Sequence, residues 1–447
     1  MQNNNNVIKA LIPLTLMSMA CVFADTQKTD MMKNNESQQR KLKEQETYNY
    51  SPRYYDLKDG KNGAFVTGDF LYWYARESNL EYAYENTFFN EPTGAATTRQ
   101  FGYATKHHYV HSKWSPGFRA GLGWNTAHDG WDLYANYTYF TNHNKHSERS
   151  KIPQFSDADE ARVVLSVDGI KNLNDPWANS DNTFPTGGAI EALTMDGKWR
   201  LVFNQLDLEL GRKFWVSKTM ALRPYVGVRG AKTHTNFTVF RDSSDPRVIQ
   251  ETQGDDIVIQ GPSIETYKNK FKNRFWGVGL VGGIQPEFHF RRNIILFGNL
   301  DGSLLWGKFT GKNHVNFVSI FEQQISNDGG QTFREADIAR GASPTENDHF
   351  TRMQGILDLA IGLRWEENWN NDSWRTSIDV GWEHHYWFDF GLYHRPIGGT
   401  ANDSLLIENP NPPPPFLGPI FHNPQQVDNF VTNLGFGGLV VRARVDF

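Results

Sequence analysis

Hydrophobic and polar residues alternate in several segments of the chain. In residues 131–140 (WDLYANYTYF), the aromatic and aliphatic side chains fall on one side, whereas Asp132 and Asn136 fall on the other. An alternation of period two is typical of a half-buried β-strand. Residues 117–124 alternate in the same way, and residues 125–130 (NTAHDG) between them have the composition of a turn. The two segments together predict a β-hairpin.

The same hairpin pattern returns three more times, at residues 206–229, 276–304 and 357–383. A single alternating segment opens the series at residues 64–75, and another closes it at residues 434–447. One opening strand, four hairpins and one closing strand make ten strands. We take ten as the minimum, because the segments between the hairpins have room for further strands.

Long polar stretches separate the hairpins, and we interpret them as loops. They cover residues 79–113, 142–197, 233–272, 309–350 and 389–432. The last stretch contains NPPPP at residues 411–415, which cannot belong to a ladder strand. Loops of this length argue against a compact soluble domain. Short turns at one end and long loops at the other are typical of outer-membrane barrels. The pattern therefore predicts an all-β fold, a closed antiparallel transmembrane β-barrel with short periplasmic turns and long extracellular loops.

The composition fits strands rather than helices as membrane-crossing elements. Mean hydropathy is −0.59, and aromatic residues make up 14% of the chain. After the first residues, no stretch approaches the 18 consecutive apolar residues that would indicate a transmembrane helix. In a membrane barrel only alternate residues face lipid, and Trp and Tyr gather at the two interfaces. A membrane barrel would show aromatic enrichment without apolar runs. A large soluble β-sandwich could share this composition, so the alternation of the strands decides between them.

The N-terminus has the composition of a secretory signal peptide. Lys9 supplies a positive charge, residues 10–23 are apolar, and small residues at positions −3 and −1 favour cleavage after Ala24. One alternative is a lipoprotein site at Cys21, although Ser18 stands where Leu usually precedes a lipidated cysteine. A second alternative is an ordinary buried helix.

Cleavage after Ala24 defines three segments. We expect a signal peptide at residues 1–24, a polar periplasmic N-terminal segment at 25–62 and the transmembrane barrel at 63–447. Cleavage also removes the only cysteine, so the mature chain has no disulfide and no thiolate metal site. With 45 basic and 50 acidic residues, the composition also argues against a nucleic-acid partner.

Charged residues lie opposite the apolar residues of the strands. A charge that faces lipid at mid-membrane costs about 2–4 kcal/mol, so the charged face must point into the lumen. We expect the following residues to line the pore: Arg119, Asp132, Asp207, Glu209, Arg223, Arg229, Glu287, Asp301, Asp358, Arg364, Asp379, Glu383, Arg442 and Arg444. Arg274, Arg375 and Asp446 are placed on the same face.

These inward charges are nearly balanced, which predicts weak ion selectivity. The residues themselves leave two arrangements open. One is a water-filled passage with a charged wall, and the other is an ion-paired, filled interior that only stabilises the barrel.

Two short motifs have the spacing of ligand-binding sites, but the pattern of the surrounding residues argues against both sites. Gly277, Gly279 and Gly282 match a dinucleotide-binding fingerprint, but that fingerprint needs a helix where these residues continue a strand. His107 and His111 have the four-residue spacing of zinc ligands on a helix, but their surroundings lack helical apolar spacing. We expect no cofactor and no metal.

Three short stretches carry a family resemblance. They are GDFLYWYA at residues 68–75, SPGFRAGLGW at 115–124 and the closing VVRARVDF at 440–447, whose terminal Phe447 matches the outer-membrane assembly signal. Together they resemble the Legionella-type and chlamydial major outer membrane protein family. The resemblance implies a surface-exposed, pore-forming barrel in the outer membrane of a Gram-negative bacterium. Members of that family are often cysteine-rich and disulfide-linked, whereas the expected mature chain has no cysteine.

We therefore expect a porin-like protein that forms a passive pore for small hydrophilic solutes, exposes large loops as a surface antigen and is not an enzyme. Its expected partners are outer membrane lipid and lipopolysaccharide, the barrel assembly machinery and the solutes. A homo-oligomer is left open by the sequence.

Two other functions remain as alternatives. A barrel enzyme of the protease or phospholipase type would need converging groups, and Glu383, His385 and Asp389 lie near a loop base where they would serve. An adhesin or receptor would use the loops as a binding surface. Converging His and carboxylate side chains at the rim would favour the enzyme, and a clear central passage would favour the pore.

The signal peptide gives the first testable prediction. We expect the mature protein to begin at Asp25, because the processing site follows Ala24. N-terminal sequencing of protein isolated from cell envelopes checks this. A sequence that still begins at Met1, or a lipid on Cys21, would contradict it.

Overall fold

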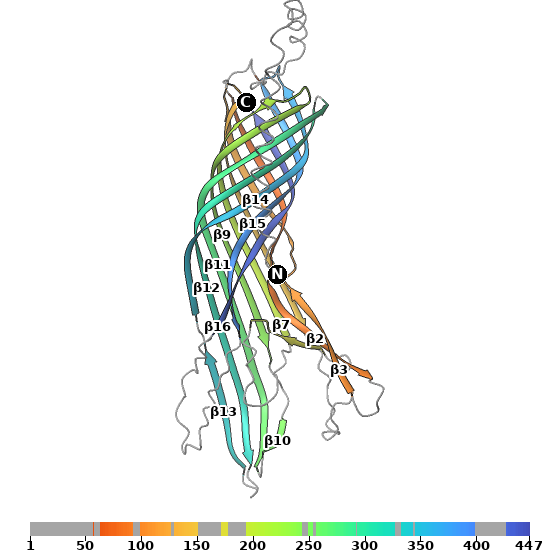
Figure 1. Cartoon of the computed structure of the whole chain (residues 1–447), viewed down its shortest axis with the longest axis vertical. Coiled ribbons are helices and arrows are strands. Elements are labelled where there is room, and N and C mark those ends of the chain that lie inside the picture. The colour runs from red at the N-terminus through yellow and green to blue at the C-terminus, as the bar shows by residue number, and fades with distance from the viewer. Residues whose placement is uncertain are drawn as a thin grey trace, which may run out of the picture. The chain divides into compact units, whose positions relative to one another are not determined.

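Ten antiparallel strands close into a barrel in the described part of the chain (Figure 1). This computed structural model describes residue 57 and residues 63–92, 99–126, 129–150, 171–177, 194–243, 249–253, 256–291, 293–326, 332–342, 345–397 and 426–447. The barrel belongs to a unit formed by residues 52–214 and 219–447. Around the barrel the strands follow one another as β1 (Gly63–Glu77), β4 (Trp114–Asn125), β5 (Trp131–Arg149), β7 (Thr194–Arg212), β9 (Met220–Asp242), β11 (Asp256–Arg291), β12 (Ile294–Ser326), β14 (Thr345–Trp369), β15 (Trp374–Ile397) and β16 (Gln426–Asp446).

Pairing of β16 with β1 closes the sheet. Ala64 and Phe447 exchange two backbone hydrogen bonds of 3.0 Å each, so the last residue of the chain takes part in closure. The ladder continues from Phe65 opposite Asp446 to Glu77 opposite Leu434. The predicted closed antiparallel barrel of at least ten strands is confirmed.

Four short turns lie at one end of the barrel, which we call the short-turn end (Figure 1). They join β4 to β5, β7 to β9, β11 to β12 and β14 to β15. The backbone enters the left-handed region at Asp129 (φ 59°) and Gly130 (φ 72°), and again at Asn370, Asn371 and Asp372. Asn, Asp and Gly tolerate this conformation best, which explains why these turns were visible in the sequence. The opposite end, with the long connections, is the long-loop end.

The expectation that the five polar stretches are loops is wrong for much of their length. Strands β11 and β12 are 36 and 33 residues long and continue far into the stretches 233–272 and 309–350. Strand β10 (Ile249–Gln253) pairs with β11, and β13 (Thr332–Ala342) pairs with β12. A separate sheet contains β2 (Glu81–Pro92), β3 (Arg99–Tyr109) and β6 (Lys171–Asn174). The two-residue strand β8 (Phe214–Trp215) lies between β7 and β9 in the chain.

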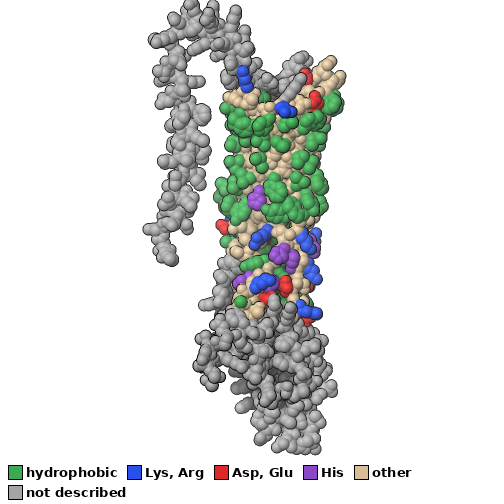
Figure 2. All heavy atoms as spheres, turned by 90° about the vertical axis from the view of Figure 1, so that its right-hand side faces the viewer, with side chains coloured by type: hydrophobic (Ala, Val, Ile, Leu, Met, Phe, Trp, Pro, Cys, Tyr) green, Lys and Arg blue, Asp and Glu red, His purple; other side chains and the backbone are tan. Residues whose placement is uncertain are grey.

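An apolar belt surrounds the half of the barrel nearest the short turns (Figure 2). Aromatic side chains mark both borders on several strands, and on β4 these are Trp114 and Trp124, which are 43% and 48% exposed. At about 3.3 Å per residue and a tilt of about 40°, the ten steps between them span about 25 Å. That is the height of the apolar band expected of an outer-membrane barrel. Within this belt the prediction that apolar side chains face outward is confirmed.

The polarity of the two faces inverts beyond the belt, toward the long-loop end. On β11 the outward residues change from Trp276 to Arg274 and Lys272, while the inward residues Phe271 and Phe275 are 3% and 1% exposed. Outside the lipid the barrel surface meets water, so apolar side chains gain burial only by turning inward. The expected lumen position of Arg274 is therefore wrong. The same inversion explains why these strands looked like polar loops.

The predicted signal peptide and all of the polar segment 25–62 except Leu57 lie outside the described residues. Among the residues that are described, no helix is long and apolar enough to cross a membrane.

Closure through the C-terminal residue gives the second prediction. Deleting Phe447, or changing it to Asp, removes the terminal aromatic side chain, and deletion also removes both hydrogen bonds to Ala64. We expect either change to block barrel assembly. The measurement is heat-modifiable electrophoretic mobility of envelope protein, with Phe447→Trp as the control that keeps an aromatic terminus. Normal mobility and normal surface exposure of the deletion variant would overturn the expectation.

Candidate functional site

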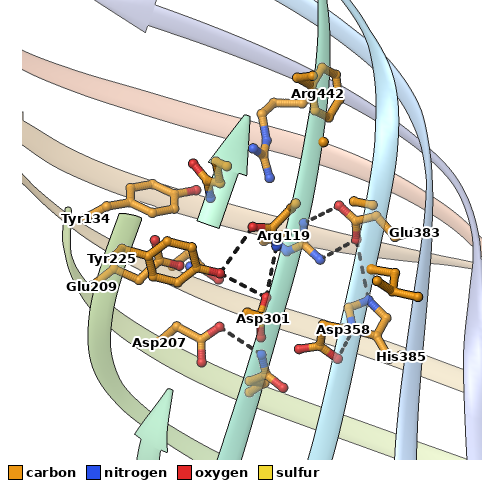
Figure 3. A pocket seen from close by; sticks show the side chains of 18 of the residues that line it. Arg119, Tyr134, Asp207, Glu209, Tyr225, Asp301, Asp358, Glu383, His385 and Arg442 are labelled. Atoms are coloured by element: carbon orange, nitrogen blue, oxygen red, sulfur yellow. Dashed lines mark hydrogen bonds and ion pairs between the residues drawn. The ribbon is translucent and has the colours of Figure 1, made fainter. Parts of the chain in front are cut away.

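The lumen of the lipid-spanning half contains a layer of charged side chains (Figure 3). All fourteen residues predicted to line the pore point to the inner face, and each makes at least one ion pair with another inward side chain. Alternation along the strands places these residues inside, and closure of the sheet brings them together.

Arg229 on β9 is the most highly connected of these residues. Its guanidinium lies 2.8 Å from Asp207, 3.3 Å from Asp301 and 2.5 Å from Asp358. It also donates a hydrogen bond to the hydroxyl of Ser303 at 3.1 Å. Because β11 and β12 lie between β9 and β14, the pair with Asp358 crosses part of the lumen. Arg229 is only 3% exposed, so its charge depends on these carboxylates.

Arg119 on β4 makes a second crossing pair. It lies 2.7 Å from Glu383 on β15, with β16 and β1 between the two strands, and 3.1 Å from Asp69 on β1. Asp69 also accepts two hydrogen bonds from Arg442, at 3.0 and 2.8 Å. One carboxylate thus joins two arginines.

The remaining arginines of the layer are held in the same way nearer the short-turn end. Arg223 bonds Asp132 at 2.5 Å and Glu209 at 3.2 Å. Arg364 bonds Asp379 at 2.8 Å and Glu287 at 2.7 Å, and Arg444 bonds Asp446 at 2.6 Å. The charges therefore form the ion-paired interior that the sequence left open.

His385 lies between two carboxylates at the border of the charged layer. Its Nδ1 is 2.8 Å from Asp358 and its Nε2 is 3.5 Å from Glu383. Its ring packs on Trp73, with the ring centroids 4.8 Å apart. Asp389, the third member of the candidate enzyme set, is exposed at a β-bulge, where its backbone N–H donates to Asn433. The structure joins Glu383 and His385 but does not add Asp389 to them.

The space between the charged side chains is small. A cavity of about 100 Å³ lies among residues that include Tyr225, Gln285, Asn299 and Arg364. A water molecule takes up about 30 Å³ in the liquid, so the cavity has room for a few waters. Sites for small organic ligands usually have about 300–1,000 Å³.

A second layer, of aromatic side chains, follows the charged layer toward the long-loop end. Phe203 on β7 meets Trp387 on β15, with ring centroids 5.9 Å apart. Four barrel strands separate β7 from β15 in either direction, so these two rings come from opposite walls. Each of these side chains is at most 1% exposed. This aromatic layer consists of Trp73, Phe140, Phe203, Phe275, Phe309, Trp387, Phe390 and Phe436.

Further aromatic packing lies beyond this layer. Trp177, which follows β6, packs against Phe271 and Tyr393 with ring centroids 4.6 and 5.9 Å away. The Tyr393 hydroxyl donates to the buried carboxylate of Glu77 at 2.9 Å, and the Trp199 indole donates to the same carboxylate at 2.9 Å. Side chains of the described residues therefore meet across the lumen in the aromatic layer, and they meet again beyond it around Trp177.

The glycine motif and the two histidines singled out in the sequence have structural explanations. Gly279 lies in β11, where an added Cβ would sit 1.9 Å from the Leu304 carbonyl oxygen, so close strand packing explains this glycine. His107 bonds Glu81 at 2.6 Å, and His111 packs on His146. Within the described ranges, no three His, Cys, Asp or Glu side chains are arranged to hold a metal ion.

Sequence reasoning missed Asp69 and the aromatic layer. Asp69 alternates with the outward residues Phe70 and Tyr72 of the opening strand, so the same rule would have found it. The aromatic layer needed a different rule, because outside the lipid the buried face is the apolar one. Alternation of Phe271 and Phe275 with basic residues was the available signal.

The charged layer gives the third prediction. Arg229→Met removes the arginine that pairs with Asp207 and Asp301 and leaves Asp358 with His385 alone, and we expect a loss of about 3–5 kcal/mol in the free energy of unfolding. Urea unfolding of the protein refolded in lipid vesicles measures it. Arg149→Met, at an exposed strand end, is the matched control and should change stability by no more than about 0.5 kcal/mol. If the two variants lose equal free energy of unfolding, the buried ion pairs do not contribute the stability proposed here.

Several solved structures match most of the chain. The outer membrane protease OmpT from Escherichia coli is 9% identical with a TM-score of 0.29, and the match covers 86% of this chain and 96% of that chain. The Pseudomonas putida toluene transporter TodX is 5% identical with a TM-score of 0.23, covering 86% and 89%. A Pseudomonas aeruginosa FadL homologue is 7% identical with a TM-score of 0.21, covering 87% and 90%. These values are too low to carry an argument about function.

No curated protein sequence matches the chain. The family model described as the Legionella pneumophila major outer membrane protein precursor, however, matches residues 61–445 and thus most of the chain, including the whole closed barrel apart from its last residues. The resemblance found in the sequence is confirmed by this match. The protein is an outer membrane β-barrel and belongs to the Legionella major outer membrane protein family.

Proposed function

We propose that the protein is a gated, passive pore for small hydrophilic solutes. The observation that carries the proposal is the lumen of the lipid-spanning half, which is lined by charged side chains. Replacing buried ion pairs with well-packed apolar residues is often neutral or stabilising. A barrel that needed only stability would therefore gain little from so many inward arginines and carboxylates. In a hydrated path, even one that opens rarely, these charged side chains would line the route of the hydrophilic solutes.

The aromatic layer is the gate of this pore. Phe203 and Trp387 approach from opposite walls, so a solute passes only after such side chains move apart. The layer consists of side chains of the barrel wall, so in this proposal it opens when those side chains rotate. We therefore infer a resting state with little conductance and brief openings. Because basic and acidic side chains are paired, the open state should discriminate weakly between cations and anions.

The long-loop end faces the cell surface in this proposal, and the short-turn end faces the periplasm. Short periplasmic turns and longer extracellular connections are the general rule for outer-membrane barrels. The barrel assembly machinery would insert the chain in this orientation, with Phe447 as its signal.

A second candidate is a surface adhesin or receptor whose barrel is only an anchor. The contact of Phe203 with Trp387 favours it, because a filled lumen suits an anchor as well as a closed gate. An enzyme has less support, because His385 is 8% exposed and lies inside the lumen between two carboxylates. Transport measurements separate the pore from the anchor.

Weakening the gate gives the fourth prediction. Trp387→Leu shortens one side of the contact with Phe203 while keeping an apolar side chain in the layer. We expect several-fold faster uptake of small sugars into liposomes that contain the variant, compared with the wild-type protein. Trp306→Leu is the matched control, since Trp306 faces outward on β12 and is 63% exposed.

Two results would count against the gate. Equal uptake by the variant, the control and the wild type would favour the anchor. Fast uptake by the wild type would mean that the aromatic layer does not close the lumen.

A further inference from the structure

A group of cations borders the lipid-facing belt on three neighbouring strands. Lys232 lies on β9, Lys270, Lys272 and Arg274 lie on β11, and Lys308 and Lys312 lie on β12. We call these six residues the basic band. All six are at outward positions, and four of them are exposed while Lys270 and Lys272 are partly exposed. Charged side chains also gather just beyond one border of the apolar belt on the face drawn in Figure 2.

Strand register places the basic band directly at the membrane border. Lys232 and Lys308 are the two cross-strand partners of Trp276, a 57% exposed residue that ends the apolar face of β11. Lys272 lies four residues further, about 13 Å along the strand and about 10 Å along the membrane normal at a tilt of about 40°. A headgroup layer adds about 5–8 Å to each side of the hydrocarbon core. The basic band therefore crosses the level of the lipid headgroups.

Among the described residues, no acidic side chain is paired with the basic band. The outward positions from 266 to 274 on β11 and from 308 to 316 on β12 contain no acidic residue. Lys272 and Lys312 are direct cross-strand partners, an arrangement in which like charges repel. Burial and the positive charges of Lys272 and Lys268 lower the pKa of Lys270, which lies beyond the lipid-facing part of β11.

Other cations of the same barrel form ion pairs with acidic side chains. Inside the lumen, the guanidinium of Arg229 has three carboxylates within 3.3 Å. On the outer surface, Arg212 pairs with Asp129 at 2.6 Å and Lys145 pairs with Asp196 at 3.4 Å. Within the described residues, the six cations of the basic band have no such partner. Repulsion between Lys272 and Lys312 is a cost that an external anion would remove.

We propose that the basic band binds the phosphate groups of lipopolysaccharide in the outer leaflet of the outer membrane. This rests on the proposed orientation, with the long-loop end at the cell surface, and not on pore activity. The acyl chains of such a lipid would lie against Val278, Leu280 and Trp306, which continue the outward face below the basic band. Its phosphates would then meet Lys232, Lys308 and Arg274 within the headgroup layer, and Lys272 and Lys312 at its outer edge. One surface thus matches both the apolar and the anionic part of the molecule.

The test compares the wild-type protein with the double variant K272Q/K312Q. The charge-matched control is K106Q/R149Q, which removes two exposed cations outside the basic band, one on β3 and one at the end of β5. Each protein is refolded in detergent, its fold is checked by heat-modifiable mobility, and binding of purified lipopolysaccharide is measured by native mass spectrometry. The probes for comparison are dephosphorylated lipopolysaccharide, inorganic phosphate and a neutral phospholipid.

We expect K272Q/K312Q to bind lipopolysaccharide at least tenfold more weakly than the wild type, and the control to bind it like the wild type. We expect none of the three comparison probes to bind the wild-type protein as well as lipopolysaccharide does. Binding of inorganic phosphate with equal affinity would overturn the choice of a lipid. Equal losses in both double variants would mean that net charge alone acts, and unchanged binding by K272Q/K312Q would overturn the site.

Thermal unfolding gives an independent readout. Without lipopolysaccharide, K272Q/K312Q should have a higher Tm than the wild type, because the repulsion between the two lysines is gone. With lipopolysaccharide, the wild type should gain Tm and the double variant should gain little. A large gain by the double variant would overturn the proposal. Sugar uptake by K272Q/K312Q liposomes is a separate result, so failure of this site and failure of the pore are distinguishable.

Discussion

A backbone N–H or C=O group in the hydrocarbon core has no water to bond to, so each must find a partner in the protein. In this chain that requirement is met by pairing β16 with β1, down to the two hydrogen bonds between Ala64 and Phe447. Closure fixes which face of every strand is inside. It therefore also determines that Asp69, Arg119 and Glu383, which are far apart in sequence, share one small space.

The barrel is surrounded by lipid along one part of its length and by water along the other. The side chains that fill its interior differ between these two parts. Where lipid surrounds the barrel, leucines, valines and tryptophans face outward, and the charges pair inside. Where water surrounds it, lysines and arginines face outward, and Phe271, Phe275 and their neighbours fill the inside. The two layers of the lumen are thus two consequences of one rule, namely that apolar side chains face whichever side is not water.

Much of this arrangement could be predicted from the sequence, because period-two alternation inside the lipid belt is unambiguous. The four hairpins, the opening and closing strands and the inward direction of Arg229 or Asp358 follow from it. The register around the barrel does not, so the crossing pair of Arg119 with Glu383 and the contact of Phe203 with Trp387 needed the structure. The long-loop half resembles polar loops in sequence because its outward residues are polar. The rule for lipid-facing strands places Arg274 inside, although this residue lies where the surface of the barrel meets water.

In the proposed function, the charged lumen is a path for solutes that aromatic side chains close, and not merely the packed interior of a membrane anchor. Single-channel recording of the refolded wild-type protein in a planar bilayer tests it most directly. We predict long closed periods interrupted by brief openings, with a reversal potential near zero across a salt gradient. A bilayer that stays silent at every voltage would contradict the path, and a channel that stays continuously open would contradict the closure.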